Sequence, residues 1–290
     1  MTVKSVAAGV MSYGSLMAHN PDAYQKMHDS DSTLTFTAEA AQVVVDIGAG
    51  GRLTSIEIDG AELLWNELDD PLSPDPVLWG CYPMVPFAGR IRHGQFTFDG
   101  TDYEIPKCFG DHSMHGYGFR NPWKQIDDDT ILYNLAEPWP FAGRVTQRFD
   151  LSPTELVVTM TVQATERQPV MFGWHPWFRR ENIAGTLEVE FAAESMYRRD
   201  VDGMPGELAS PPPPGPWDDC FVGIASPPVL RWGELAVELS SSLDHWVVFD
   251  EPEHAACVEA QSGPPNEINT GPRIVEAGES FSGTFTLRFG

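Results

Sequence analysis

Two histidines and one glutamate have the side-chain chemistry of a general acid–base site. His115 lies in the glycine-punctuated loop Met114–Phe119, His175 lies among aromatic residues, and Glu259 ends a short apolar stretch. An imidazole and a carboxylate can exchange protons near neutral pH when their surroundings adjust their pKa values. Each residue alone is equally compatible with hydrogen-bonded packing or an exposed position. Their joint occurrence leads us to predict a metal-free acid–base site.

Aromatic residues surround the second histidine. Trp174, Trp177 and Phe178 flank His175 within five positions. Aromatic faces pack against the C–H faces of pyranose rings, and a few polar groups then fix the hydroxyls. A cluster of this kind also occurs in ordinary protein cores. Together with the acid–base residues, it predicts a concave pocket for a small-molecule sugar.

A metal centre is the alternative use of these histidines. His112 and His115 are three residues apart, and His175 could supply a third ligand. The glycines around the first pair disfavour the helix that would place both on one face. GxSxG, GxGxxG and P-loop patterns are absent from the sequence. We therefore expect no metal and no cofactor.

The charge of the chain restricts its partners. The 290 residues include 18 basic and 42 acidic side chains, which gives a net charge of −24. This field repels nucleic acids and anionic membranes. Four cysteines without CxxC spacing predict reduced thiols, and neither a signal peptide nor a long apolar run is apparent. We expect a cytoplasmic protein, either a monomer or a homodimer.

The elements that must position these residues read as strands. Short alternating segments separated by turn residues run from Thr33 onward, and neither long helical periodicity nor βα alternation appears. We expect an N-terminal arm over 1–32 and a single all-β domain over 33–290, with the proline run 211–216 as a surface excursion. The strands are predicted at 34–36, 43–47, 53–58, 95–98, 101–105, 131–135, 144–151, 155–163, 186–191, 236–239, 246–249, 255–259 and 282–289.

From about Val43 to Phe289 the sequence resembles the aldose 1-epimerase (galactose mutarotase-like) family. Five motifs in the family's order carry the resemblance: Pro86-Phe87-Ala88-Gly89-Arg90-Ile91 with the hairpin Gly94–Gly100, His115-Gly116, His175-Pro176-Trp177-Phe178, Asp218 three residues before Phe221, and Glu259-Ala260-Gln261 followed by Pro265-Asn266. The resemblance implies a large antiparallel β-sandwich, the galactose mutarotase-like supersandwich. It also implies cofactor-independent interconversion of the α and β anomers of a free aldohexose.

The resemblance assigns a role to each site residue. Glu259 would be the base, His175 the acid that protonates the ring oxygen, and His115 a group that holds the ring oxygen or a neighbouring hydroxyl. The substrate-binding residues would be Arg90, Asp218, Trp177 and Gln261, with Asp219 as an alternative to Asp218.

Three other functions fit part of the pattern. A hexose-6-phosphate 1-epimerase would use Arg92, Lys107 and Arg120 to bind a phosphate, although ordinary surface charge explains these residues as well. A non-catalytic carbohydrate-binding β-sandwich would keep the aromatic platform but would not need a matched acid and base. A metal-dependent cupin-like enzyme is the third alternative.

Overall fold

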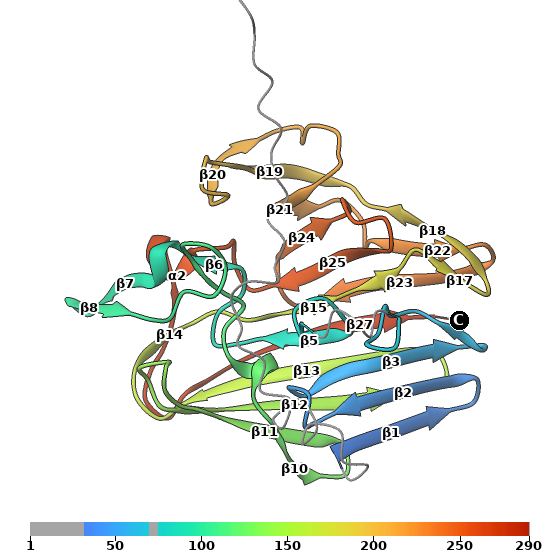
Figure 1. Cartoon of the computed structure of the whole chain (residues 1–290), viewed down its shortest axis with the longest axis horizontal. Helices are drawn as coiled ribbons and strands as arrows, with labels where there is room; N and C mark the ends of the chain where they lie inside the picture. The colour runs from blue at the N-terminus through green and yellow to red at the C-terminus, as the bar shows by residue number, and fades with distance from the viewer. Residues whose placement is uncertain (1–31, 70–74, 290) are drawn as a thin grey trace, which may run out of the picture.

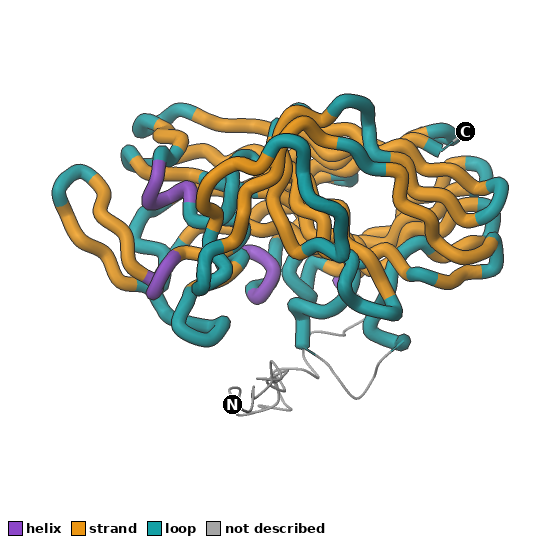
Figure 2. Tube along the Cα trace, turned by 90° about the horizontal axis from the view of Figure 1, so that it is seen from above, coloured by secondary structure: helices purple, strands orange, loops and turns teal. Residues whose placement is uncertain are grey.

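Antiparallel strands dominate the computed structural model, which describes residues 32–69 and 75–289. In Figure 2 the trace is almost entirely strand and loop, with only short helical pieces. Two large sheets pack face to face, and the β7–β8 hairpin projects from one side (Figure 1). The predicted all-β antiparallel sandwich is therefore confirmed. No helix among the described residues is long and apolar enough to cross a membrane.

The first sheet contains the strands that will matter for the site. Within the described ranges it has twelve strands, in the order β1-β2-β3-β5-β15-β25-β24-β21-β19-β20, with β4 paired to β3 and β16 paired to β25. Their bounds are β1 Thr33–Ala38, β2 Ala41–Asp46, β3 Arg52–Ile58, β4 Ala61–Glu62, β5 Cys81–Met84, β15 Gly173–Pro176, β16 Phe178–Arg179, β19 Ala193–Arg199, β20 Pro205–Ala209, β21 Asp218–Ile224, β24 His245–Phe249 and β25 Ala255–Gln261.

The second sheet has nine strands in the described part of the chain, in the order β10-β11-β12-β13-β27-β23-β22-β18-β17. Their bounds are β10 Lys124–Asp127, β11 Thr130–Leu135, β12 Gly143–Leu151, β13 Glu155–Ala164, β17 Glu181–Asn182, β18 Gly185–Glu190, β22 Val229–Trp232, β23 Leu235–Ser241 and β27 Ser280–Arg288. Smaller pieces are β6 Arg90–Ile91, β7 Gln95–Phe98, β8 Thr101–Glu104, β9 Ser113–Met114, β14 Gln168–Val170, β26 Arg273–Val275, the 3₁₀ turns η4 Arg92–Gly94 and η5 Gly118–Arg120, and the short helix α2 Glu267–Thr270.

Burial along the strands explains this arrangement. β12 and β13 alternate between buried and more exposed residues, so one face of each strand meets the core and the other meets solvent. β5, β15 and β25 are instead buried at every position. These three strands are neighbours in the middle of the first sheet, so a second layer covers their outer face. The candidate site lies on this part of the first sheet, because β15 and β25 carry His175 and Glu259.

The predicted strands agree with the observed ones to within two residues at nearly every end. The sequence reading missed several strands, including β5, β15, β19 and β21, which contribute to the site. A single hydrophobic cluster includes residues from Ala41 to Phe289, and the proline run lies between β20 and β21. The predicted arm over 1–32 falls almost wholly outside the described residues.

Candidate active site

Three neighbouring strands place the predicted acid and base side by side. On β15, His175 pairs with Tyr82 of β5, and Gly173 of the same strand pairs with Gln261 of β25. Two residues further along this antiparallel pairing, His175 comes level with Glu259. Because residues two apart on a strand face the same side, Glu259 and Gln261 project from one face.

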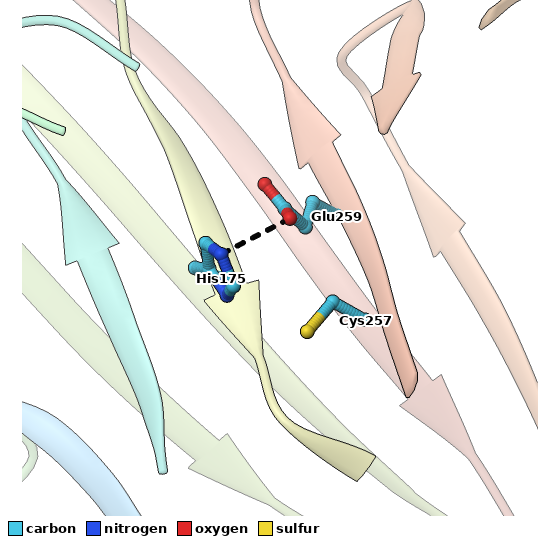
Figure 3. A group of neighbouring side chains, drawn as sticks. All are labelled: His175, Cys257 and Glu259. Atoms are coloured by element: carbon cyan, nitrogen blue, oxygen red, sulfur yellow. Dashed lines mark ion pairs between the residues drawn. The ribbon is translucent and has the colours of Figure 1, made fainter. Parts of the chain in front are cut away.

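The side chains of this pair are in direct contact. His175 Nε2 lies 3.2 Å from Glu259 Oε1, and Figure 3 shows the two side chains pointing toward each other. The Gln261 side-chain amide donates a hydrogen bond of 2.8 Å to the other carboxylate oxygen, Oε2. The carboxylate is therefore held from both sides, with one oxygen facing an imidazole that can take or give a proton.

His115 reaches the same place from a loop. Its backbone is left-handed, with φ of 59°, and its amide donates to the carbonyl of Gly89 at 2.8 Å. The next residue must be glycine, since a Cβ on Gly116 would lie 2.2 Å from the carbonyl oxygen of Val85. The resulting turn places the His115 ring 5.1 Å from the His175 ring, at 82° to it.

Burial shifts the pKa values of all three groups toward their neutral forms. Burial lowers the pKa of His175 to about 3 and that of His115 well below its usual value. The charge of a protonated His175 would lower the pKa of His115 further. Burial also raises the pKa of Glu259 well above that of an ordinary carboxyl, although its hydrogen bond to Gln261 opposes the rise. The His175–Glu259 pair is therefore most stable with no net charge, which means one shared proton.

A cavity of about 460 Å³ opens onto these residues. Its walls include all seven of the predicted site residues: His115, His175, Glu259, Arg90, Asp218, Trp177 and Gln261. Four buried polar atoms of these seven residues have no hydrogen-bond partner among the described residues: His115 Nδ1, His175 Nδ1, Gln261 Oε1 and Arg90 Nε. Buried polar groups are normally satisfied, so these atoms are suited to binding the hydroxyls of a ligand.

Part of the cavity wall is charged. Arg199 contacts both candidate aspartates, with Nη1 at 3.1 Å from Asp218 Oδ2 and Nε at 3.0 Å from Asp219 Oδ1. Arg90 lies 3.6 Å from Asp218 and donates to the carbonyl of Gly203 at 2.8 Å. Burial raises the pKa of Asp218, and both arginines oppose that rise. Asp218 and Asp219 both line the cavity, so either could contact a substrate.

The aromatic wall forms a stack around His175. The Tyr82 ring stacks on the His175 ring, with centroids 4.7 Å apart and planes at 20°. The Trp177 ring also stacks on His175, at 5.3 Å and 21°. Trp177 in turn stacks on His254, which also lines the cavity. Trp174 instead belongs to the core, where its indole N–H donates to Gln147.

The basic residues of the phosphate-specific alternative, and His112 of the metal alternative, do not line this cavity. Arg92 forms ion pairs with Asp200 and Asp202, and neither Lys107 nor Arg120 belongs to the cavity wall. His112 accepts a hydrogen bond from the amide of His93 through Nδ1, so it does not join His115 and His175 in a ligand set. Among the described residues, the cluster with metal-binding geometry is instead His175, Cys257 and Glu259.

Sequence reasoning missed several cavity residues. Arg199, Tyr197 and His254 carry no recognisable motif, and they reach the cavity only through the pairing of strands or loops that are distant in the sequence. Tyr82, which stacks on His175 but does not line the cavity, offered a weak signal, because it lies four residues before the Pro86-Phe87 motif.

Comparison with known proteins supports the same family. The model of the family "Aldose 1-epimerase" matches residues 32–213. The chain is 35% identical over 105 residues to the uncharacterized protein YphB of Escherichia coli K12 and 28% identical over 201 residues to the galactose mutarotase of Rattus norvegicus. These alignments cover 34% and 61% of this chain, and 36% and 57% of the two relatives.

Solved structures share the fold at low identity. A putative aldose 1-epimerase from E. coli K12 superposes with a TM-score of 0.77 at 21% identity, covering 89% of this chain and 98% of the other. A galactose mutarotase-like protein from Clostridium acetobutylicum gives 0.75 at 17% identity, covering 88% and 94%. The family model matches residues 32–213, which is more than half of this chain, and this match shows that the chain belongs to the aldose 1-epimerase family.

Proposed function

We propose that this protein is a cofactor-independent isomerase that interconverts the α and β anomers of a free aldohexose. The observation that carries the proposal is the contact of 3.2 Å between His175 and Glu259 in the wall of a cavity that His115 also lines. A binding module needs polar contacts with its sugar but does not need an acid and a base held together. The relatives named galactose mutarotase support the same reaction type.

In the proposed reaction Glu259 and His175 exchange protons with the sugar. Before ring opening, the proton of the pair moves across the 3.2 Å contact from the Glu259 carboxyl to His175. The resulting Glu259 carboxylate takes the proton of the C1 hydroxyl, the bond between C1 and the ring oxygen breaks, and His175 delivers its proton to that oxygen. Rotation about the C1–C2 bond turns the aldehyde, and the reverse transfers close the ring on its other face. The site loses and gains one proton at each ring opening, so its net charge stays constant, which suits a buried pair.

The remaining polar groups are proposed to hold the sugar. Arg90, Asp218 and Gln261 would bind hydroxyls, since each lines the cavity, and His115 would hold the ring oxygen or a neighbouring hydroxyl. Trp177 would pack against the apolar side of the ring. Asp219 remains the alternative to Asp218.

Charge in the cavity favours an unphosphorylated sugar. Its two arginines, Arg90 and Arg199, already contact Asp218 and Asp219, and Glu259 adds a third acidic group. A phosphate would therefore meet arginines that are already paired. We expect mutarotation of glucose or galactose to be faster than that of glucose 6-phosphate, and the reverse order would support the phosphate-specific alternative.

Polarimetry of freshly dissolved α-D-glucose and α-D-galactose tests the proposal. His115→Asn should slow the catalysed change in rotation by about 10²-fold or more, because a group that touches the reacting atoms is lost. His93→Asn is the matched control, since His93 is exposed, lies outside the cavity and has a left-handed backbone that asparagine tolerates. Sugar-dependent tryptophan fluorescence without any rate gain would instead identify a binding protein.

A further inference from the structure

A cysteine lies beside the proposed acid–base pair and has no part in the proposed reaction. Cys257 precedes Glu259 by two residues on β25, so both project from the same face of the strand. The thiol sulfur, an imidazole nitrogen of His175 and a carboxylate oxygen of Glu259 all lie within 4.8 Å of one another. Figure 3 shows the sulfur on the side of the strand where His175 and Glu259 meet.

We propose that His175, Cys257 and Glu259 bind a thiophilic divalent cation, with zinc as the preferred ion, and that the bound ion reversibly inhibits the enzyme. The inhibition rests on the proposed function, because it requires His175 and Glu259 to be the acid and the base. The binding itself depends only on the three side chains.

The donor set matches the chemistry of zinc. Zinc takes cysteine sulfur, histidine nitrogen and carboxylate oxygen at about 2.0–2.3 Å, and open sites have three protein ligands and one exchangeable position. Two ligands at these bond lengths on a tetrahedron lie about 3.3–3.6 Å apart. The separation of 3.2 Å between His175 Nε2 and Glu259 Oε1 already fits this spacing.

The thiol would complete the site by releasing its proton to water as the metal–sulfur bond forms, together with a small movement. The ligand atoms all lie within 4.8 Å of one another, so the Cys257 sulfur would move by at most about 1 Å, which rotation of one side-chain bond can supply. A hard cation such as magnesium would not gain from this set, because it prefers six oxygen ligands.

The ion can reach the site through the cavity that the sugar would use. His175 and Glu259 line that cavity, whereas Cys257 is fully buried beside them and is not part of its wall. The overall charge of −24 favours the approach of cations. Coordination occupies the imidazole nitrogen and the carboxylate oxygen that would exchange protons with the sugar. Zinc and sugar should therefore exclude each other.

Two measurements test binding and inhibition separately. Titration of the full chain with Co²⁺, a spectroscopic substitute for zinc, should give the intense absorption of a cobalt–thiolate bond at one ion per chain. Polarimetry should show inhibition by Zn²⁺ that excess sugar relieves and that a chelator reverses.

Cysteine variants identify the ligand. Cys257→Ala should lose the cobalt–thiolate absorption, require at least about tenfold more zinc for inhibition, and retain mutarotation in chelator. Cys81→Ala is the matched control, because Cys81 is also buried in the same sheet, on β5, but lies outside the cluster. It should keep both the absorption and the sensitivity to zinc.

Several results would overturn the proposal. These are no thiolate absorption in the wild type, equal zinc sensitivity in Cys257→Ala, or activation by zinc. A chain that binds cobalt through Cys257 but shows no mutarotation in chelator would support the metal site and refute the proposed function. A chain that is active but shows neither absorption nor inhibition would support the proposed function and refute the metal site.

Discussion

Replacing Glu259 by glutamine tests the role of the carboxylate with little change in structure. Glutamine has nearly the same shape, and its amide can still contact both neighbours. Its carbonyl oxygen can accept the hydrogen bond from Gln261, and its NH₂ group can donate to His175 Nε2. The buried site keeps its packing and its hydrogen bonds, so the variant loses mainly the ability to accept a proton.

The expected loss follows from that single missing step. A positioned acid or base contributes about 10²–10⁴-fold to a rate, which corresponds to about 2.7–5.4 kcal/mol in the activation free energy. Because burial raises the pKa of Glu259, its carboxylate is a stronger base than an ordinary one, and we expect a value in the upper half of this range. The stability of the variant should equal or exceed that of the wild type, since an ionisable group leaves a buried position.

Polarimetry at several enzyme concentrations measures the catalysed rate above the spontaneous one. Glu62→Gln is the matched control, because Glu62 is a partly buried glutamate of the same sheet outside the cavity and accepts hydrogen bonds from Ser55 and two backbone amides. Its rate should stay close to that of the wild type. A Glu259→Gln enzyme that works within threefold of the wild type would refute the assignment of Glu259 as the base.

Three further predictions concern the site and a buried arginine outside it. Burial lowers the pKa of His175 from 6.5 to about 3, so the unfolded chain binds more protons between these values and acid destabilises the native state. Urea unfolding at about pH 7 and about pH 5 should show the wild type losing stability relative to His175→Asn, by up to about 1.4 kcal/mol per pH unit, and parallel curves would contradict this. KM and kcat of Asp218→Asn and Asp219→Asn should separate the aspartate that contacts the sugar from the one that only holds Arg199. Replacing the aspartate that contacts the sugar should raise KM more strongly. Equal effects on KM would contradict a single contact. Arg52→Met should lower the free energy of unfolding by about 3–5 kcal/mol, because it leaves buried carbonyls of four residues without a donor, and a loss below 1 kcal/mol would contradict that reasoning.

Most of the strands that were predicted from the sequence have one face exposed to solvent, with the fully buried β25 as an exception. β12 and β13 alternate between buried and exposed residues, and that period is visible in the sequence. The central strands β5 and β15 are buried throughout, and each contains a proline, which usually argues against a strand. Both faces of these strands are covered by other parts of the chain. Their residues therefore show no alternation of polar and apolar types that would mark a strand in the sequence.

The candidate site could be predicted in its composition but not in its geometry. The ordered motifs brought His115, His175 and Glu259 together as a set, and the cavity contains all three. The contact between His175 and Glu259 depends on the register of β15 with β25, which no spacing in the sequence expresses. Arg199 was missed for the same reason, since it arrives on a strand that pairs with β21.

The order of strands in the first sheet also has a consequence for folding. β5, β15 and β25 are neighbours in space but lie far apart along the chain, whereas β12 and β13 are joined by a short turn. Contacts between distant segments require closure of long loops, and this lowers the conformational entropy before the favourable strand contacts have formed. Such contacts therefore form slowly. We therefore expect local hairpins to form first and the β5–β15–β25 pairing late. In refolding experiments the recovery of activity should then lag behind the recovery of β-sheet circular dichroism.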